Sequence, residues 1–135
     1  MGDAKLAANR PLSPHLSIYR PMLTMLMSIA HRITGFGNAV GFLLLAWWLV
    51  AIAAGPEKYA VVSSFFGSIV GRTVLFLFSW GLIHHMLGGI RHLIWDTGHG
   101  FDKTSVEIFA LATIIGSTVL TILVWLVGYW LKGAF

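Results

Sequence analysis

Residues 73–94 read TVLFLFSWGLIHHMLGGIRHLI, a run that is apolar except for a few histidine, arginine and hydroxyl side chains. A transmembrane α-helix needs about 20 consecutive, mostly apolar residues, so this run is long enough to cross a bilayer. Two runs of similar character occupy residues 33–54 and 108–131. Hydrophobic residues make up 57% of the 135-residue chain and charged residues only 10%, unlike a soluble domain. The sequence therefore predicts an all-α membrane protein with three transmembrane helices.

The residues that flank these runs divide the chain. Pro11, Pro14 and Pro21 predict an ordered N-terminal arm, and proline favours the first turn of a helix, so the first helix should begin near Pro21. We expect an arm over residues 1–20 and a single three-helix module over residues 21–135, with spans at about 28–54, 73–94 and 108–131. The moderately polar residues 56–72 predict a short interfacial helix.

Basic residues are unevenly distributed along the chain. The chain has nine Lys and Arg residues and five Asp and Glu residues, which gives a formal net charge of +4. The side of the membrane that holds the arm carries the larger group of basic residues: Lys5, Arg10, Arg20, Arg32, Arg91 and Lys103. The opposite side carries the smaller group: Lys58, Arg72 and Lys132. Because Lys and Arg concentrate on the cytoplasmic side of membranes, we expect a cytoplasmic N-terminus.

Composition also narrows the location and the partners. No aromatic and basic residues interleave as in a nucleic-acid platform, so we expect membrane lipids, and not nucleic acid, around the chain. The first residues have the features of neither a signal peptide nor a transit peptide. We therefore expect a multi-pass protein of the bacterial cytoplasmic (inner) membrane, with the mitochondrial inner membrane as the less favoured alternative.

The second run carries polar side chains at a depth where they are rare. His85 and His92 are seven residues apart and share one helix face, while Gly88 and Gly89 between them leave room for a flat macrocycle. The chain has no cysteine, so histidine is its only strong ligand for a soft or borderline metal. This pattern predicts bound haem with His85 as the iron ligand. His84 is the competing ligand, and histidines that bind only lipid or a neighbouring helix are the alternative without a cofactor.

A second polar cluster opens the first helix. Ser28, His31 and Arg32 occupy positions i, i+3 and i+4 and share one helix face. If the first helix leaves the cytoplasmic side and the second returns to it, this cluster lies at the same depth as Arg91 and His92. We expect one pocket with a basic rim, toward which an iron-bound haem would direct its acidic propionates.

Three ordered motifs carry a resemblance to a known family: RPLSPHLSIYRP (residues 10–21), SIAHRITG (residues 28–35) and HMLGGIRHLIWD (residues 85–96). Together they resemble the cytochrome b anchor subunit of succinate dehydrogenase (succinate:quinone oxidoreductase, complex II). The resemblance extends from residue 10 through the third span, and the three motifs keep their order and spacing.

The resemblance implies specific roles for residues of both clusters. His85 would be one axial ligand of haem b, with the other supplied by a second membrane-anchor subunit. Ubiquinone or menaquinone would be reduced beside Ser28 and Arg32, with Ile29 and Met27 along the apolar side of the quinone ring. His31 and Arg32 would hold the haem propionates.

The resemblance also implies partners and a place in metabolism. Electrons from succinate would pass through an FAD-containing flavoprotein subunit and an iron-sulfur subunit to the quinone, as part of the tricarboxylic acid cycle. This chain would then be an enzyme subunit without catalytic activity of its own. The alternatives are the anchor of a fumarate reductase or of another quinone-linked cytochrome b, and a non-redox membrane scaffold or transporter subunit.

Overall fold

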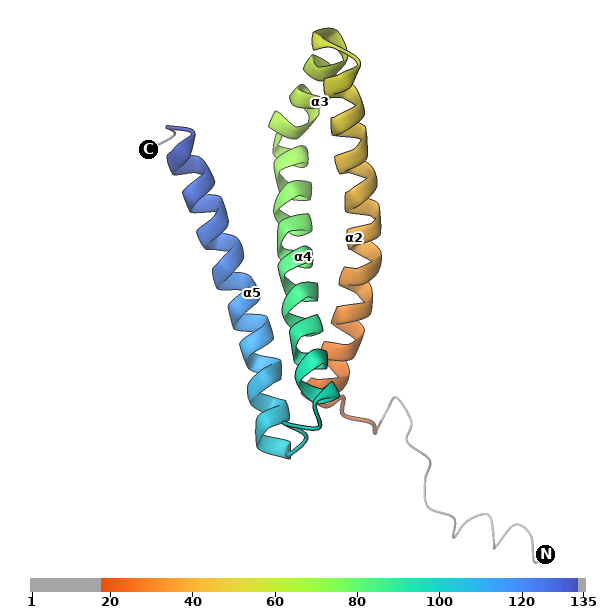
Figure 1. The fold of residues 1–135 in the computed structure, drawn as a ribbon, viewed down its shortest axis with the longest axis vertical. Coiled ribbons are helices and arrows are strands. Elements are labelled where there is room, and N and C mark those ends of the chain that lie inside the picture. Colours follow the sequence, from red (N-terminus) through yellow and green to blue (C-terminus); the bar gives the residue numbers. More distant parts are fainter. Residues whose placement is uncertain (1–17, 134–135) are drawn as a thin grey trace, which may run out of the picture.

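The computed structural model describes residues 18–133 of the chain. Within these residues it contains helices and no strand: α2 (Leu23–Ala53), α3 (Pro56–Gly67), α4 (Ile69–Asp96) and α5 (Lys103–Leu131). Figure 1 shows α2 and α4 side by side and antiparallel, with α3 at the end where the chain turns from one to the other. Helix α5 runs along the other side of α4 and diverges from it toward the C-terminus.

Helices α2, α4 and α5 are long and apolar enough to cross a membrane, which confirms the predicted all-α fold class with three transmembrane helices. The short helix expected within residues 56–72 is also present as α3. One detail differs from the prediction: Pro21 precedes the N-cap residue Met22, so it ends the arm and does not lie in the first turn. Residues 1–17 of the predicted arm over residues 1–20 lie outside the described residues.

The interior of the helix bundle is largely small or polar, as in helices that pack within a membrane. The buried hydrophobic residues of the described part are Met27, Ala51, Val62 and Ala110. Large apolar side chains such as Phe36 (76% exposed) and Ile69 (86% exposed) point outward instead. This inside-out distribution suits a hydrocarbon environment, because lipid solvates apolar side chains as well as a protein core does.

A seam of hydroxyl groups joins α5 to α4. Thr113, Ser117 and Thr121 repeat at every fourth position of α5, and each is at most 3% exposed. Two indole N–H groups cross the interface: Trp80 Nε1 donates to Thr118 Oγ1 and Trp125 Nε1 donates to Ser79 Oγ, both at 3.3 Å. Because lipid gives no hydrophobic drive for helices to associate, small residues and such hydrogen bonds are what hold α5 in place.

A glycine allows α2 and α4 to approach each other closely. A Cβ atom at Gly41 would lie 2.0 Å from the Phe78 ring of α4, so only glycine fits there. Gly37, one turn earlier, has nothing within 4 Å of the corresponding position. The contact at Gly41 therefore fixes the distance between the two helices above the polar clusters.

The first turn of α5 provides a pH-dependent prediction. Asp102, outside the membrane-spanning segment, caps the helix by accepting a hydrogen bond of 2.9 Å from the Ser105 backbone N–H. Hydrogen bonds from the side chain and backbone of Ser105 lower the pKa of the Asp102 carboxyl below its ordinary value of 3.8. Since the folded-state pKa is the lower one, the cap stabilises α5 above pH 3.8 and is lost as the pH falls below it.

We therefore expect Asp102→Ala to speed amide hydrogen exchange at Ser105 at neutral pH, because the acceptor is removed. Asp102→Asn keeps an acceptor oxygen and should change the exchange rate less. Equal exchange rates in the wild type and Asp102→Ala would contradict the cap.

Candidate functional site

Two imidazole rings meet between α2 and α4. His31 lies near the start of α2 and His85 lies in the second half of α4, and the antiparallel arrangement brings them to the same level. Their ring centroids are 3.9 Å apart and their planes differ by 12°, so the rings are stacked. Both side chains are half-buried. The structure thus unites the two histidines that the sequence places in separate motifs.

Backbone carbonyls determine which ring nitrogen of each histidine carries the proton. His85 Nδ1 lies 3.1 Å from the carbonyl oxygen of His31, and His31 Nε2 lies 3.3 Å from the carbonyl oxygen of His85. A carbonyl oxygen can only accept, so both of these nitrogens donate. The neutral His85 ring therefore presents its lone pair at Nε2. A carbonyl that holds the other ring nitrogen is also the usual environment of a metal-ligating histidine.

Each ring packs against a glycine of the opposite helix. A Cβ atom at Gly35 would lie 3.0 Å from His85 Cε1, and a Cβ atom at Gly88 would lie 2.4 Å from His31 Cδ2. Gly89 has nothing within 4 Å of the corresponding position. The sequence predicted that Gly88 and Gly89 make room beside His85. In the structure, Gly88 is the one that is closely packed, and it packs against His31.

The neighbouring histidine, His84, faces the other way. It is 1% exposed, its Nδ1 lies 3.2 Å from Ser117 Oγ on α5, and its ring stacks on Trp80 at 4.8 Å. Its Nε2 is buried without a hydrogen-bond partner among the described residues. Helix α4 therefore directs its two adjacent histidines toward different helices, and this geometry supports His85, not His84, as the ligand beside α2.

A hydroxyl and a guanidinium lie together on α2 beside the histidine pair. Arg32 Nη2 donates to Ser28 Oγ at 3.4 Å, across one helical turn. Arg32 is exposed and Ser28 is half-buried. Ile29, which the resemblance places along a quinone ring, is 51% exposed on the same turn, whereas Met27, placed there with it, is only 2% exposed and lies inside the bundle. Ser28, Ile29 and Arg32 are accessible to a ligand that approaches α2 from outside the chain, and Met27 is not.

The two basic residues at the end of α4 diverge. His92 is exposed, and its ring lies 5.4 Å from the ring of His31, so it borders the histidine pair. Arg91 is only 5% exposed, with its guanidinium 5.1 Å from the centre of the Trp95 ring, and it lines a small cavity with Thr113 of α5. The prediction of one shared pocket is therefore right for His92, which borders the histidine pair, and wrong for Arg91, which faces α5. The two side chains diverge because consecutive helix residues point about 100° apart.

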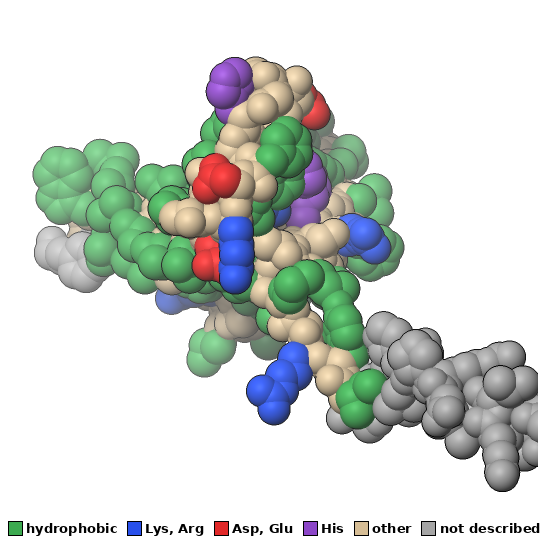
Figure 2. All heavy atoms as spheres, turned by 90° about the horizontal axis from the view of Figure 1, so that it is seen from below, with side chains coloured by type: hydrophobic (Ala, Val, Ile, Leu, Met, Phe, Trp, Pro, Cys, Tyr) green, Lys and Arg blue, Asp and Glu red, His purple; other side chains and the backbone are tan. Residues whose placement is uncertain are grey.

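Ionisable side chains gather at this end of the molecule. Figure 2 looks directly onto it and shows histidine, basic and acidic side chains among hydrophobic ones. Within residues 18–133, no group of three or more His, Cys, Asp or Glu side chains could hold a metal ion.

Sequence reasoning missed the direct contact between the two histidines, since it expected His31 at the rim of a haem and not against His85. A signal for the contact was present. Gly35 follows His31 by four residues and Gly88 follows His85 by three, so each histidine has a glycine about one turn away on its own helix. In an antiparallel pair, this spacing places each ring opposite the glycine of its neighbour.

Comparisons with known proteins identify the family of this chain. Residues 7–124 match the model of the family described as "Succinate dehydrogenase/Fumarate reductase transmembrane subunit". The chain is 41% identical over 115 residues to the succinate dehydrogenase cytochrome b556 subunit of Paracoccus denitrificans, covering 85% of this chain and 88% of the relative. It is 36% identical over 116 residues to the same-named subunit of Rickettsia prowazekii, covering 86% and 90%.

A mitochondrial protein is also similar. The succinate dehydrogenase cytochrome b560 subunit of Mus musculus is 34% identical over 111 residues, covering 81% of this chain and 66% of the relative. The region that matches the family model, residues 7–124, contains both histidines of the pair and the Ser28–Arg32 turn. The chain therefore belongs to the succinate dehydrogenase/fumarate reductase transmembrane subunit family.

Proposed function

We propose that this chain is the haem b-binding membrane anchor of a succinate dehydrogenase and forms part of its quinone-reduction site. The observation that carries the proposal is the pairing of His31 and His85 between α2 and α4, with His85 Nε2 available as a ligand. The relatives from Paracoccus denitrificans and Rickettsia prowazekii are named cytochrome b556 subunits of succinate dehydrogenase, which supports haem b as the bound group.

The donor set of the described residues fits haem b with a single axial ligand from this chain. His85 Nε2 would bind the iron, and the stacked His31 covers the face of the imidazole, not the direction in which Nε2 points. Arg32 and the exposed His92 suit the two propionates, because charged donors bind carboxylates strongly. His31 would reach a propionate only through Nδ1, because its Nε2 donates to the carbonyl of His85. Arg91 adds positive charge behind this rim. A second membrane-anchor subunit would supply the other axial ligand, and the bound haem would provide a one-electron redox centre near the quinone.

The Ser28–Arg32 turn has the chemistry that a quinone site needs. The hydroxyl and the guanidinium, 3.4 Å apart, can both donate hydrogen bonds to a quinone carbonyl oxygen. The fixed positive charge of Arg32 stabilises the negative charge that develops on this oxygen during reduction. Ile29 offers an apolar contact for the ring from the same turn. Ubiquinone and menaquinone both present such a carbonyl beside an apolar ring.

Partner subunits would carry out the remaining steps. An FAD-containing flavoprotein subunit would oxidise succinate and an iron-sulfur subunit would pass the electrons on, so succinate would not contact this chain. These soluble subunits would dock at the end that holds the histidine pair. With the arm on the cytoplasmic side, this end faces the cytoplasm, and a bacterial inner membrane is the expected location.

The proposal is tested by expressing the affinity-tagged chain together with a flavoprotein, an iron-sulfur protein and a second anchor. We expect all four to co-purify, to show a reduced b-type absorption band and to reduce quinone with succinate. A colourless assembly without quinone reductase activity would favour the non-redox scaffold. Faster fumarate reduction by quinol than succinate oxidation would assign the chain to a fumarate reductase instead.

The glycine beside His31 provides a further prediction. Gly88→Val should lower the amount of haem per purified complex, because its Cβ would lie 2.4 Å from His31 and force this ring away from His85. Gly89→Val is the matched control, since nothing lies within 4 Å of its Cβ position. The haem-to-protein ratio, measured from the absorption of the reduced complex, decides the outcome. Equal ratios for the two variants would show that the stacked arrangement is not needed for haem binding.

A further inference from the structure

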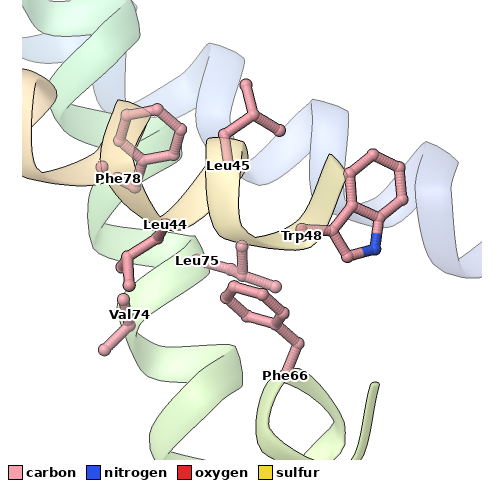
Figure 3. A pocket seen from close by; sticks show the side chains of 8 residues that line it. Leu44, Leu45, Trp48, Phe66, Val74, Leu75 and Phe78 are labelled. Carbon is pink, nitrogen blue, oxygen red and sulfur yellow. The ribbon is translucent and has the colours of Figure 1, made fainter. Parts of the chain in front are cut away.

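An apolar cavity lies at the end of the bundle opposite to the histidine pair. It has a volume of about 340 Å³ and lies between α2, α3 and α4. Figure 3 shows the side chains that line it: Leu44, Leu45, Trp48, Phe66, Val74, Leu75 and Phe78. The volume is within the range of about 300–1,000 Å³ that is typical of small-molecule sites, and every lining side chain is apolar. The cavity is therefore suited to a hydrocarbon chain.

A polar cavity of about 520 Å³ adjoins the apolar one. The two share Trp48, Phe66 and Leu75 in their walls, so they border each other. Arg72 and Lys132 line the polar cavity, and none of its lining residues within the described part of the chain is acidic. The site thus has a basic compartment beside an apolar one.

The positions of the two cations indicate a ligand. Arg72 lies in the first turn of α4 and Lys132 lies at the C-cap of α5, so two different helices bring them to one cavity. The helix dipole disfavours a cation in a first turn. Both cations also lie at the end of the bundle that carries the smaller share of the basic residues. An anion between them would offset the dipole and the mutual repulsion.

We propose that the two cavities together bind one anionic phospholipid. Its phosphate lies between Arg72 and Lys132, and one acyl chain occupies the apolar cavity. Basic pockets between transmembrane helices are typical sites for acidic headgroups, and tyrosine and tryptophan are enriched at that depth. Tyr59 and Trp125 line the polar cavity at this level. Residues of α3, α4 and α5 line the polar cavity, so the bound lipid connects α3 to α5.

The test uses the whole complex, purified in detergent and freed of loosely bound lipid. Native mass spectrometry counts the lipids that remain bound after incubation with phosphatidylglycerol or phosphatidylcholine. We expect the wild type to retain one more phosphatidylglycerol than the double variant Arg72→Gln/Lys132→Gln, and equal numbers of phosphatidylcholine. Lys58→Gln removes a cation of α3 that lines neither cavity, so this control should retain the wild-type number.

Two more variants separate the halves of the site. Arg72→Lys/Lys132→Arg keeps both charges and should retain the lipid. Leu45→Trp fills the apolar cavity without changing a charge and should lose it. The b-type absorption band reports assembly of every variant, because these residues lie at the opposite end from His85.

Several outcomes would overturn the proposal. Equal phosphatidylglycerol counts in the wild type and in Arg72→Gln/Lys132→Gln would contradict the proposed headgroup site. Retention of the extra phosphatidylglycerol by Leu45→Trp would contradict the proposed acyl-chain site. Inorganic phosphate can be added at the same concentration as phosphatidylglycerol. If it displaced the retained phosphatidylglycerol, the two cations would bind a free anion and not a lipid.

Discussion

Replacing His85 with leucine is expected to abolish most of the reduced b-type absorption band of the purified complex. His85 is the histidine of α4 that faces α2, and its Nδ1 is held by the carbonyl of His31, which directs Nε2 toward a ligand. Leucine has no lone pair to offer to iron, so this chain would lose the residue that is proposed to hold the haem. The measurement is a reduced-minus-oxidised spectrum of a complex whose subunit composition is checked in parallel.

Two other histidines of α4 serve as controls for this result. His92→Gln removes one of the proposed propionate donors but leaves the proposed iron ligand in place, so it should preserve most of the band. His84→Gln changes the contact with Ser117 on α5 and should lower stability more than haem content. If His84→Gln removed the band and His85→Leu did not, the ligand would be the adjacent histidine and the geometry beside α2 would have no role in iron binding.

Replacing Arg32 with glutamine should lower quinone reduction by succinate about 100-fold, because one fixed donor to a developing negative charge is removed. Succinate oxidation with a soluble artificial acceptor should not change, since electrons then leave the complex before they reach this chain. Steady-state assays of the same preparation with both acceptors provide the comparison.

Lys103→Gln is the matched control, because Lys103 is an exposed cation at the same end of the bundle but on α5. It should leave both activities near the wild-type values. Arg32→Lys keeps the charge without the planar guanidinium and should recover part of the activity. An equal loss of both activities in Arg32→Gln would mean that the substitution damages the assembly and would contradict a role at the quinone.

The transmembrane helices could be predicted from the sequence because the bilayer constrains both their length and their composition. The apolar runs located all three, whereas each helix begins several residues before its run. Helix α2 continues toward its N-terminus through Ser28 and His31, since polar side chains are tolerated where a helix emerges from the hydrocarbon. Helix α5 begins at Lys103 because Asp102 caps it, and hydropathy does not detect a cap.

The candidate site was only partly predictable. The spacing of His85 and His92 and the Ser28–Arg32 turn could be read from the sequence, because each involves a single helix. Helix α4, however, has neighbours on two sides, and the sequence does not specify which face meets α2 and which meets α5. The position of Arg91 against α5 depends on this rotation of the helix about its axis, which is set by contacts such as that of Gly88 with His31.

The reciprocal hydrogen bonds between His31 and His85 connect the orientation of each imidazole to the backbone of the other helix. A slide of α4 along α2 by one residue, about 1.5 Å, would lengthen both bonds at once and rotate the two rings together. The direction in which His85 Nε2 points would therefore depend on the register between the two helices, so the same two contacts that orient the imidazoles also record how far α4 has moved along α2.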